Sequence, residues 1–194
     1  MPGGYTGKIC FVDLTSGEIQ IEKLTDTKAR NFIGGHGLGA RTLFERQPKG
    51  VDPLGPENIL GFTTGPLTGT KTPTGGRYMV VCKSPLTGGW GDANSGGYFG
   101  SELKAAGLDA VYVSGKSTKP AYLLIQNGKL ELRDASHLWG QDTIATEETL
   151  HSETAEKRLR VASIGPASER LSLISGISND GAAVDSRLDP VSGL

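Results

Sequence analysis

Cysteine is scarce in this sequence, and its scarcity excludes several kinds of site. The 194 residues include only Cys10 and Cys82, which are too few for a disulfide framework or for the four thiolates of an iron–sulfur cluster. We expect both to be small buried apolar residues in a reducing compartment. Histidine is equally rare, and His36, His137 and His151 share no metal-ligand spacing with cysteine or with one another. We interpret each histidine as structural or exposed.

An excess of charge and a long apolar run are also lacking. Twenty Lys and Arg residues balance 21 Asp and Glu residues without a basic run, which argues against nucleic-acid binding and against an anionic membrane surface. No window reaches 18 apolar residues, and the opening MPGGYTGK has no apolar signal segment. The sequence therefore predicts a cytoplasmic protein without a membrane partner.

Glycine is the residue type in excess. The chain has 29 glycines and 10 prolines, and they lie between apolar runs without the Gly-X-Y period of collagen. The backbone is therefore expected to make many turns or to approach another group closely.

The apolar runs predict an α+β fold. We expect strands at Lys8–Leu14, Glu18–Leu24, Asn58–Thr64, Tyr78–Lys83, Ala110–Ser114, Ala121–Ile125, Lys129–Arg133, Arg160–Ile164 and Leu171–Ile177, and helices at Thr27–Ile33, Leu38–Arg46, Tyr98–Ala106 and Thr143–Lys157. Asn127-Gly128 is the strongest hairpin signal, and residues 65–76 and 84–97 are interpreted as long loops. Because the strands cluster instead of alternating with helices, β-rich mixed or antiparallel sheets with a few short helices are favoured.

Two short glycine motifs suggest nucleotide binding, and both fail the context test. Residues Gly35–Ala40 satisfy G-x-G-x-x-A, but a short helix is expected before them where a dinucleotide site needs a strand. A helix-to-helix turn is the favoured interpretation, and a strand leading into that turn would revive a dehydrogenase. The Gly115-Lys116-Ser117 run lacks the first glycine of a phosphate-binding loop.

Two segments together suggest a site for a phosphorylated cofactor with a flat, polar body. In the first, Gly75 and Gly76 remove side chains just before Arg77, whose guanidinium can form two parallel hydrogen bonds. The second leads into a helix whose first amides favour an anion, and it consists of Asn94, Ser95, Gly96 and Gly97. The alternative is that the glycines only serve tight turns and that Arg77 pairs with a carboxylate.

These segments are where the chain becomes similar to a known family. The run GPLTGTKTPTGGRYMVVCKSPLTGGWGDANSGGYFGSELKAAGLDAVYVSGK closely resembles the N-terminal domain of the tungsten-containing aldehyde ferredoxin oxidoreductase family. The same resemblance holds for YTGKICFVDLTSGEI, NFIGGHGLGARTLFE, RDASHLWG and ASIGPASE. It covers residues 5–181.

The resemblance implies a domain that forms the base for a tungsten or molybdenum bis-pterin cofactor. In the family a magnesium ion bridges the pterin phosphates, and the position of Asn94 offers its backbone carbonyl to that ion. The positions of Arg77 and Gly96 contact the pterin or its phosphate. The cofactor itself supplies the soft dithiolene sulfurs, so a domain poor in cysteine can serve such a metal.

The family reaction oxidises an aldehyde with water to a carboxylic acid and passes electrons through a [4Fe–4S] cluster to ferredoxin. By resemblance, the cluster ligands and the acid/base residues belong to later domains, so we assign no catalytic residue and expect the isolated chain to be inactive. We expect partners to be those domains, a partner subunit, or a second copy.

The end of the chain departs from the family pattern. We divide the chain into a cofactor-binding domain, residues 1–181, and a divergent or truncated tail, residues 182–194. The tail lacks the family's second phosphate clamp, and Arg187 is no convincing replacement because no glycine flanks it. The alternative function is therefore a non-enzymatic remnant that acts as a subunit, a cofactor carrier or an interaction module.

Overall fold

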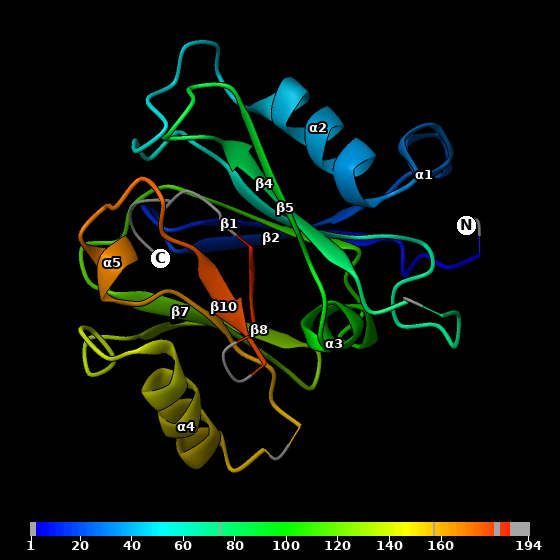
Figure 1. Cartoon of the computed structure of the whole chain (residues 1–194). Coiled ribbons are helices and arrows are strands. Elements are labelled where there is room, and N and C mark those ends of the chain that lie inside the picture. Colours follow the sequence, from blue (N-terminus) through cyan, green and yellow to red (C-terminus); the bar gives the residue numbers. More distant parts are fainter. Residues whose placement is uncertain (1–2, 74, 157, 181–182, 187–194) are drawn as a thin grey trace.

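A six-stranded sheet forms the centre of the protein (Figure 1). The computed structural model describes residues 3–73, 75–156, 158–180 and 183–186. The strand order is β2-β1-β6-β3-β4-β5. The bounds are β1 Lys8–Asp13, β2 Glu18–Lys23, β3 Leu60–Thr64, β4 Tyr78–Lys83, β5 Trp90–Ser95 and β6 Ala110–Ser114. Strands β1 and β6 pair in parallel and the other neighbours pair antiparallel. The mixed α+β fold predicted from the sequence is confirmed.

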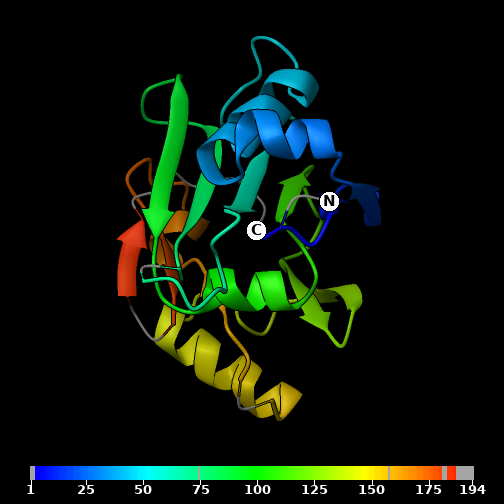
Figure 2. The ribbon, with the colours of Figure 1, turned by 90° about the vertical axis from the view of Figure 1, so that its right-hand side faces the viewer.

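The remaining elements cover the two faces of this sheet (Figures 1 and 2). Helices α1 (Asp26–Phe32) and α2 (Gly35–Arg46) lie on one face. The other face is covered by α3 (Phe99–Ala105), the hairpin β7 (Ala121–Gln126) and β8 (Lys129–Asp134), α4 (Thr143–Thr154) and α5 (Pro166–Glu169). A small sheet is formed there by β9 (Ala162–Ser163), β10 (Ile177–Asn179) and β11 (Ala183–Ser186). Within the described residues, no helix is both long and apolar enough to cross a membrane.

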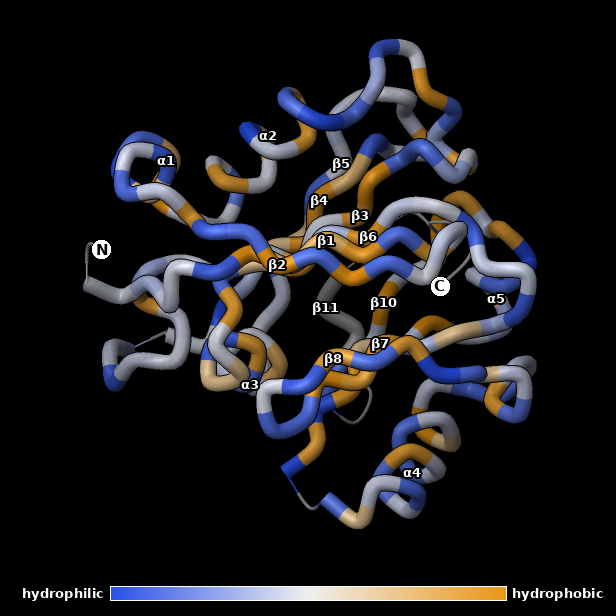
Figure 3. Tube along the Cα trace, turned by 180° about the vertical axis from the view of Figure 1, so that it is seen from behind, coloured by the Kyte–Doolittle hydropathy of each residue, from blue (hydrophilic) through white to orange (hydrophobic). Residues whose placement is uncertain are grey.

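Apolar side chains of the central strands are buried on both faces of the sheet. Figure 3 shows by colour that hydrophobic residues recur along these strands. On the α2 side, Leu38 packs with Met79 and Val81. On the other side, the hairpin β7–β8 packs against Val111 and Val113. The continuous apolar run of β4 therefore belongs to a strand buried on both faces, as its pattern predicts.

Both cysteines are fully buried, as expected, and neither forms a disulfide. Cys10 lies on β1 and Cys82 on β4, in separate apolar clusters. Burial raises the pKa of the Cys10 thiol to about 11, so it stays protonated and unreactive at neutral pH.

The prediction of a loop over residues 84–97 is wrong for residues 90–95, which form strand β5. The strand pairs with β4 over six positions, from Tyr78–Ser95 to Lys83–Trp90. Its Gly, Asp and Asn residues have low strand propensity. Pairing with the buried β4 supplies the backbone hydrogen bonds that overcome this preference.

The last third of the chain also differs from the expectation. The predicted strand Leu171–Ile177 is wrong, because residues 170–175 form turns after α5 and β10 begins only at Ile177. Leu171 has a left-handed backbone with φ 58°, which an extended strand does not allow. The predicted strand Arg160–Ile164 shortens to β9. The helix predicted to Lys157 ends at Thr154, and Lys157 lies outside the described residues.

The glycine motif Gly35–Ala40 lies inside α2 and not in a turn after a strand. Helix α2 begins at Gly35, three residues before the predicted start, and it follows α1 directly. At the junction Gly34 has φ 71°, and a Cβ atom there would lie 2.6 Å from the Thr64 carbonyl oxygen. The helix-to-helix arrangement is therefore confirmed. Helix α1 precedes the motif at the place where a dehydrogenase site requires a strand.

Candidate cofactor-binding site

The two glycine-rich segments meet at one end of β4 and β5. Residues 75–77 lead into β4 and residues 94–97 end β5, and the antiparallel register places Tyr78 opposite Ser95. A Cβ atom on Gly76 would lie 2.7 Å from the Gly97 carbonyl oxygen, so only glycine allows this approach. We call residues 75–77 and 94–97 the shelf. The structure thus brings together all seven predicted site residues. Thr74, which precedes them in the chain, lies outside the described residues.

Arg77 binds the other segment of the shelf. Its Nε donates a hydrogen bond to Asn94 Oδ1, and its Nη2 donates to the Asn94 backbone carbonyl at 3.0 Å. Among the described side chains, its partner is therefore this asparagine and not the carboxylate of the alternative interpretation. A guanidinium has five N–H donors, so three have no partner in the described part of the chain. Both side chains are exposed, which leaves these donors accessible to an anion.

The Asn94 carbonyl is the atom that the resemblance assigns to magnesium. It now accepts a hydrogen bond from a cation, and a second cation at the same oxygen would be repelled. Arg77 therefore engages the atom that the resemblance assigns to magnesium.

The start of α3 differs from the expectation of a phosphate-binding helix start. The carboxylate of Asp180 lies there, and its Oδ2 accepts hydrogen bonds from the backbone N–H of Tyr98 at 2.6 Å and of Phe99 at 3.2 Å. The chain's own anion therefore occupies the place that was expected for a phosphate. Asp180 is 82 residues from Tyr98 in the sequence, and no local motif marks this contact.

Ser95 is a buried residue of the shelf. It is 1% exposed, and its Oγ accepts a hydrogen bond from Asn179 Nδ2 at 3.0 Å. Its neighbours on the strand, Asp92 and Asn94, are exposed and lie on the opposite side of β5, next to β4 residues that pack against α2. Asn94 is thus exposed to solvent, while Ser95 holds the segment in place.

A histidine fixes β5 to the neighbouring helix. His36 Nδ1 in the first turn of α2 lies 2.6 Å from Asp92 Oδ2. The pair links the end strand of the sheet to α2, two residues from Asn94. This agrees with the structural interpretation of His36, but the sequence gives no signal that Asp92 is its partner.

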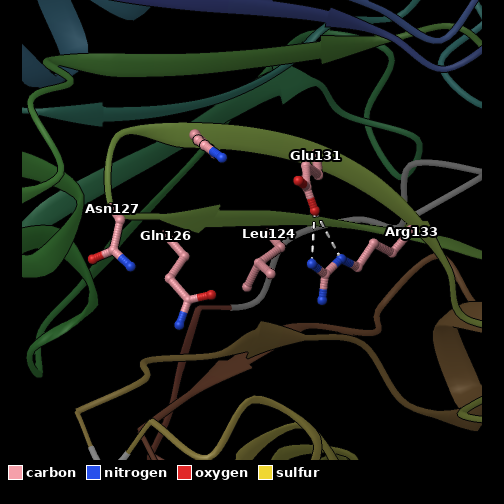
Figure 4. A pocket seen from close by; sticks show the side chains of 6 residues that line it. Leu124, Gln126, Asn127, Glu131 and Arg133 are labelled. Atoms are coloured by element: carbon pink, nitrogen blue, oxygen red, sulfur yellow. Dashed lines mark hydrogen bonds and ion pairs between the residues drawn. The ribbon is translucent and has the colours of Figure 1, made fainter.

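Two hollows lie away from the shelf. One of about 290 Å³ is lined by the hairpin residues Leu124, Gln126, Asn127, Lys129, Glu131 and Arg133. Figure 4 shows that Glu131 and Arg133 there bind each other. A larger one of about 720 Å³ lies between the central sheet and the layer of β7, β8 and α4, with mostly apolar side chains. Neither is lined by the shelf. An apolar hollow does not match a phosphate, so the shelf is the better site for an anionic cofactor.

No group of three or more His, Cys, Asp or Glu residues that could hold a metal ion is found within the described ranges. The polar groups of the shelf are the Arg77 guanidinium, the Asn94 amide, the Ser95 hydroxyl and the backbone.

Comparison with known proteins agrees with this fold. The family model described as the aldehyde ferredoxin oxidoreductase N-terminal domain matches residues 9–189. The tungsten-containing aldehyde ferredoxin oxidoreductase of Pyrococcus furiosus is 48% identical over 178 residues, which are 92% of this chain and 29% of that protein. The enzyme of the same name from Thermococcus kodakarensis is 49% identical with the same coverage.

A solved structure has the same fold over the whole chain. It belongs to the active site complex BamBC of benzoyl coenzyme A reductase with 1,5-dienoyl-CoA. The TM-score is 0.89 at 35% identity, and the match covers 100% of this chain and 32% of that one. The chain thus spans less than a third of the length of these relatives. It belongs to the family of aldehyde ferredoxin oxidoreductase N-terminal domains.

Proposed function

We propose that this chain binds the phosphate end of a tungsten or molybdenum bis-pterin cofactor on the shelf. The observation that carries the proposal is the convergence of two glycine-rich segments beside the exposed guanidinium of Arg77. A flat cofactor requires a surface from which side chains do not project, and its phosphate requires a cation with free donors. The shelf offers both.

The residues present fit the cofactor's anionic end. Arg77 keeps three N–H donors for a phosphate, and Asn94 holds the guanidinium in a fixed orientation. The Asn94 backbone carbonyl, which also accepts a hydrogen bond from Arg77, would be the ligand for magnesium. When bound, the cofactor supplies the dithiolene sulfurs and the redox-active metal. This chain's residues bind and orient it.

The proposal places the chain in an enzyme that oxidises an aldehyde with water to a carboxylic acid and passes two electrons through a [4Fe–4S] cluster to ferredoxin. The names of the relatives support this reaction. The cluster ligands must come from other domains or subunits, because the two cysteines of this chain are buried in separate apolar clusters. Catalytic acid/base residues are likewise assigned outside this chain.

The test is to replace Arg77 and to measure the bound cofactor. The chain is produced with tungstate in a host that makes the pterin, and tungsten and oxidised pterin are quantified per polypeptide. Arg77→Ala is expected to weaken binding about 10- to 100-fold, because a hydrogen bond to a charged group contributes about 1.5–3 kcal/mol.

The matched control is Arg133→Ala. Arg133 is also exposed and bound to a nearby group of its own chain, but it lies on the hairpin β7–β8, away from the shelf. This variant should keep the cofactor at the wild-type level. Full retention of tungsten and pterin by Arg77→Ala would contradict the proposal.

A further inference from the structure

A buried asparagine behind the shelf contacts its second segment and also Tyr78, the residue that follows its first segment. Asn179, at the end of β10, is 3% exposed. Its Nδ2 lies 2.7 Å from Tyr78 Oη, 3.0 Å from Ser95 Oγ and 3.4 Å from the Gly96 carbonyl oxygen. Tyr78 directly follows Arg77 in the chain. One amide group therefore links the Tyr78 side chain to the end of β5.

The next residue continues this contact along the shelf. Asp180 Oδ2 accepts the backbone N–H groups of Tyr98 and Phe99. Asp180 has a left-handed backbone with φ 49°, which Asp and Asn tolerate better than most residues. Its Oδ1 lies 3.6 Å from Nε of Arg160, whose guanidinium lies 4.9 Å from the Tyr98 ring centroid. Asn179 and Asp180 thus contact Ser95, Gly96, Tyr98 and Phe99.

Several polar atoms of this region are buried without a hydrogen bond. Among the described residues these are Ser178 Oγ and Asn179 Oδ1, together with Asp180 Oδ1 and Arg160 Nε, which form only the ion pair with each other at 3.6 Å. Buried polar atoms without partners destabilise a fold. An apolar segment at this place would pack without that cost, but it could not bind the backbone and hydroxyl groups of the shelf.

We infer that Asn179 and Asp180 are positioning residues. They set the position and orientation of the Gly96–Gly97 backbone relative to Arg77. This inference rests on the proposed function. Asn179 holds the end of β5, and Asp180 holds the first amides of α3. Gly97 lies between these two contacts and has φ 77°, and a side chain there would collide with Asp180. Without both contacts the shelf would lose the fixed geometry that a rigid cofactor requires.

Hydrogen–deuterium exchange of the chain tests the positioning directly. The variants are Asn179→Ala, which removes three contacts without a change of charge, and Asp180→Gly, which keeps the left-handed backbone. Both are expected to increase exchange over residues 95–99 at least tenfold. Where Asp180→Gly does not fold, Asp180→Asn replaces it.

The matched control is Asn58→Ala. Asn58 is also buried, and its Nδ2 donates to the carbonyls of Pro53 and Lys83 at the opposite end of β4. This variant should increase exchange near residues 53–59 and leave residues 95–99 protected. If Asn179→Ala changes residues 95–99 no more than Asn58→Ala does, the inference is wrong.

Tungsten and pterin content of the same proteins then separates the two hypotheses. Folded Asn179→Ala is expected to hold less than a tenth of the wild-type content, and Asn58→Ala the full amount. A loosened shelf with full cofactor content overturns the inference alone. A wild-type chain that holds no cofactor overturns the proposed function and the inference with it, whatever the exchange data show.

Discussion

At the scale of single residues, Gly76 and Gly97 determine how closely the two segments of the shelf approach. A Cβ atom on Gly76 would reach the Gly97 carbonyl oxygen, and Gly97 also has a left-handed backbone. These two glycines therefore serve close approach and backbone conformation together. Arg77 and Asn94 add the polar groups at the same place. The glycines leave room for the Arg77 side chain, which is held by the Asn94 side chain and backbone carbonyl.

Cys10 permits a prediction about stability and pH. Burial raises the pKa of its thiol to about 11, whereas an unfolded chain loses this proton near pH 8.5. Above pH 8.5 the folded state therefore holds more protons than the unfolded state, and the free energy of unfolding falls as pH rises. The loss attributable to this thiol between pH 8 and pH 10.5 should be about 2 kcal/mol.

Urea unfolding of wild type and Cys10→Ala over this pH range measures the effect. Contributions of lysines and tyrosines are common to both proteins, so the difference between the two pH profiles isolates the thiol. Cys10→Ala should show the shallower decline. Parallel profiles would show that the thiol titrates alike in the folded and unfolded states.

At the scale of elements, the sequence predicts best those strands whose own residues favour them. The run Met79–Cys82 predicts β4, and Asn127-Gly128 predicts the β7–β8 turn, where both residues have positive φ. Strand β5 could not be predicted this way, because its small and polar residues are extended only through pairing with β4. The turns at residues 170–175 were missed because Leu171, Leu173 and Ile174 resemble a strand but are exposed.

The contact between α2 and β4 gives a prediction at this scale. Gly39 lies against Val81, and a Cβ atom on Gly39 would lie 2.8 Å from Val81 Cγ2. Gly39→Ala favours the helix by about 1 kcal/mol through its higher helix propensity. The new Cβ atom overpacks the contact with Val81, and the shift of α2 that this requires costs about 1–3 kcal/mol. We expect a net destabilisation of about 1 kcal/mol.

The combination with Val81→Ala identifies the cause. Removing the valine methyl groups makes room for the new Cβ atom, so the double variant should be more stable than the two single effects predict, by about 1 kcal/mol. Urea unfolding of the four proteins of this cycle gives the coupling. If Gly39→Ala alone is more stable than wild type, the close packing of α2 on β4 does not limit this position.

At the scale of the whole molecule, the arrangement depends on contacts that the sequence does not reveal. Strand β6 inserts between β1 and β3, so that Cys10 pairs with Val111 across about a hundred residues of chain. Asp180 reaches Tyr98 in the same way. Glycine patterns and the family resemblance located all seven shelf residues, but their support from Asn179 and Asp180 required the fold.

The comparison with solved structures also limits what this domain determines. The same fold occurs in a complex named for benzoyl coenzyme A reductase and in relatives named for aldehyde oxidation. The names cover different substrates while the domain is shared. Substrate choice is therefore expected to depend on the two thirds of those relatives that this chain does not span.

The apolar hollow of about 720 Å³ between the two layers predicts that they differ in stability. It lies between part of the central sheet and the layer around α4, and a hollow there removes packing that would couple the two. Helix α4 buries only Thr146 and Leu150. The layer around α4 should therefore unfold before the central sheet.

The two tryptophans report on these layers separately. Trp90 lies on β5 of the central sheet, whereas Trp139 lines the hollow in the other layer. In urea, the fluorescence of Trp90→Phe, which follows Trp139, should change about 1 M before that of Trp139→Phe, which follows Trp90. Circular dichroism controls for any stability difference between the variants. Coincident transitions would show that the packing of β7 and β8 against the sheet is enough to join both layers into one cooperative unit despite the hollow between them.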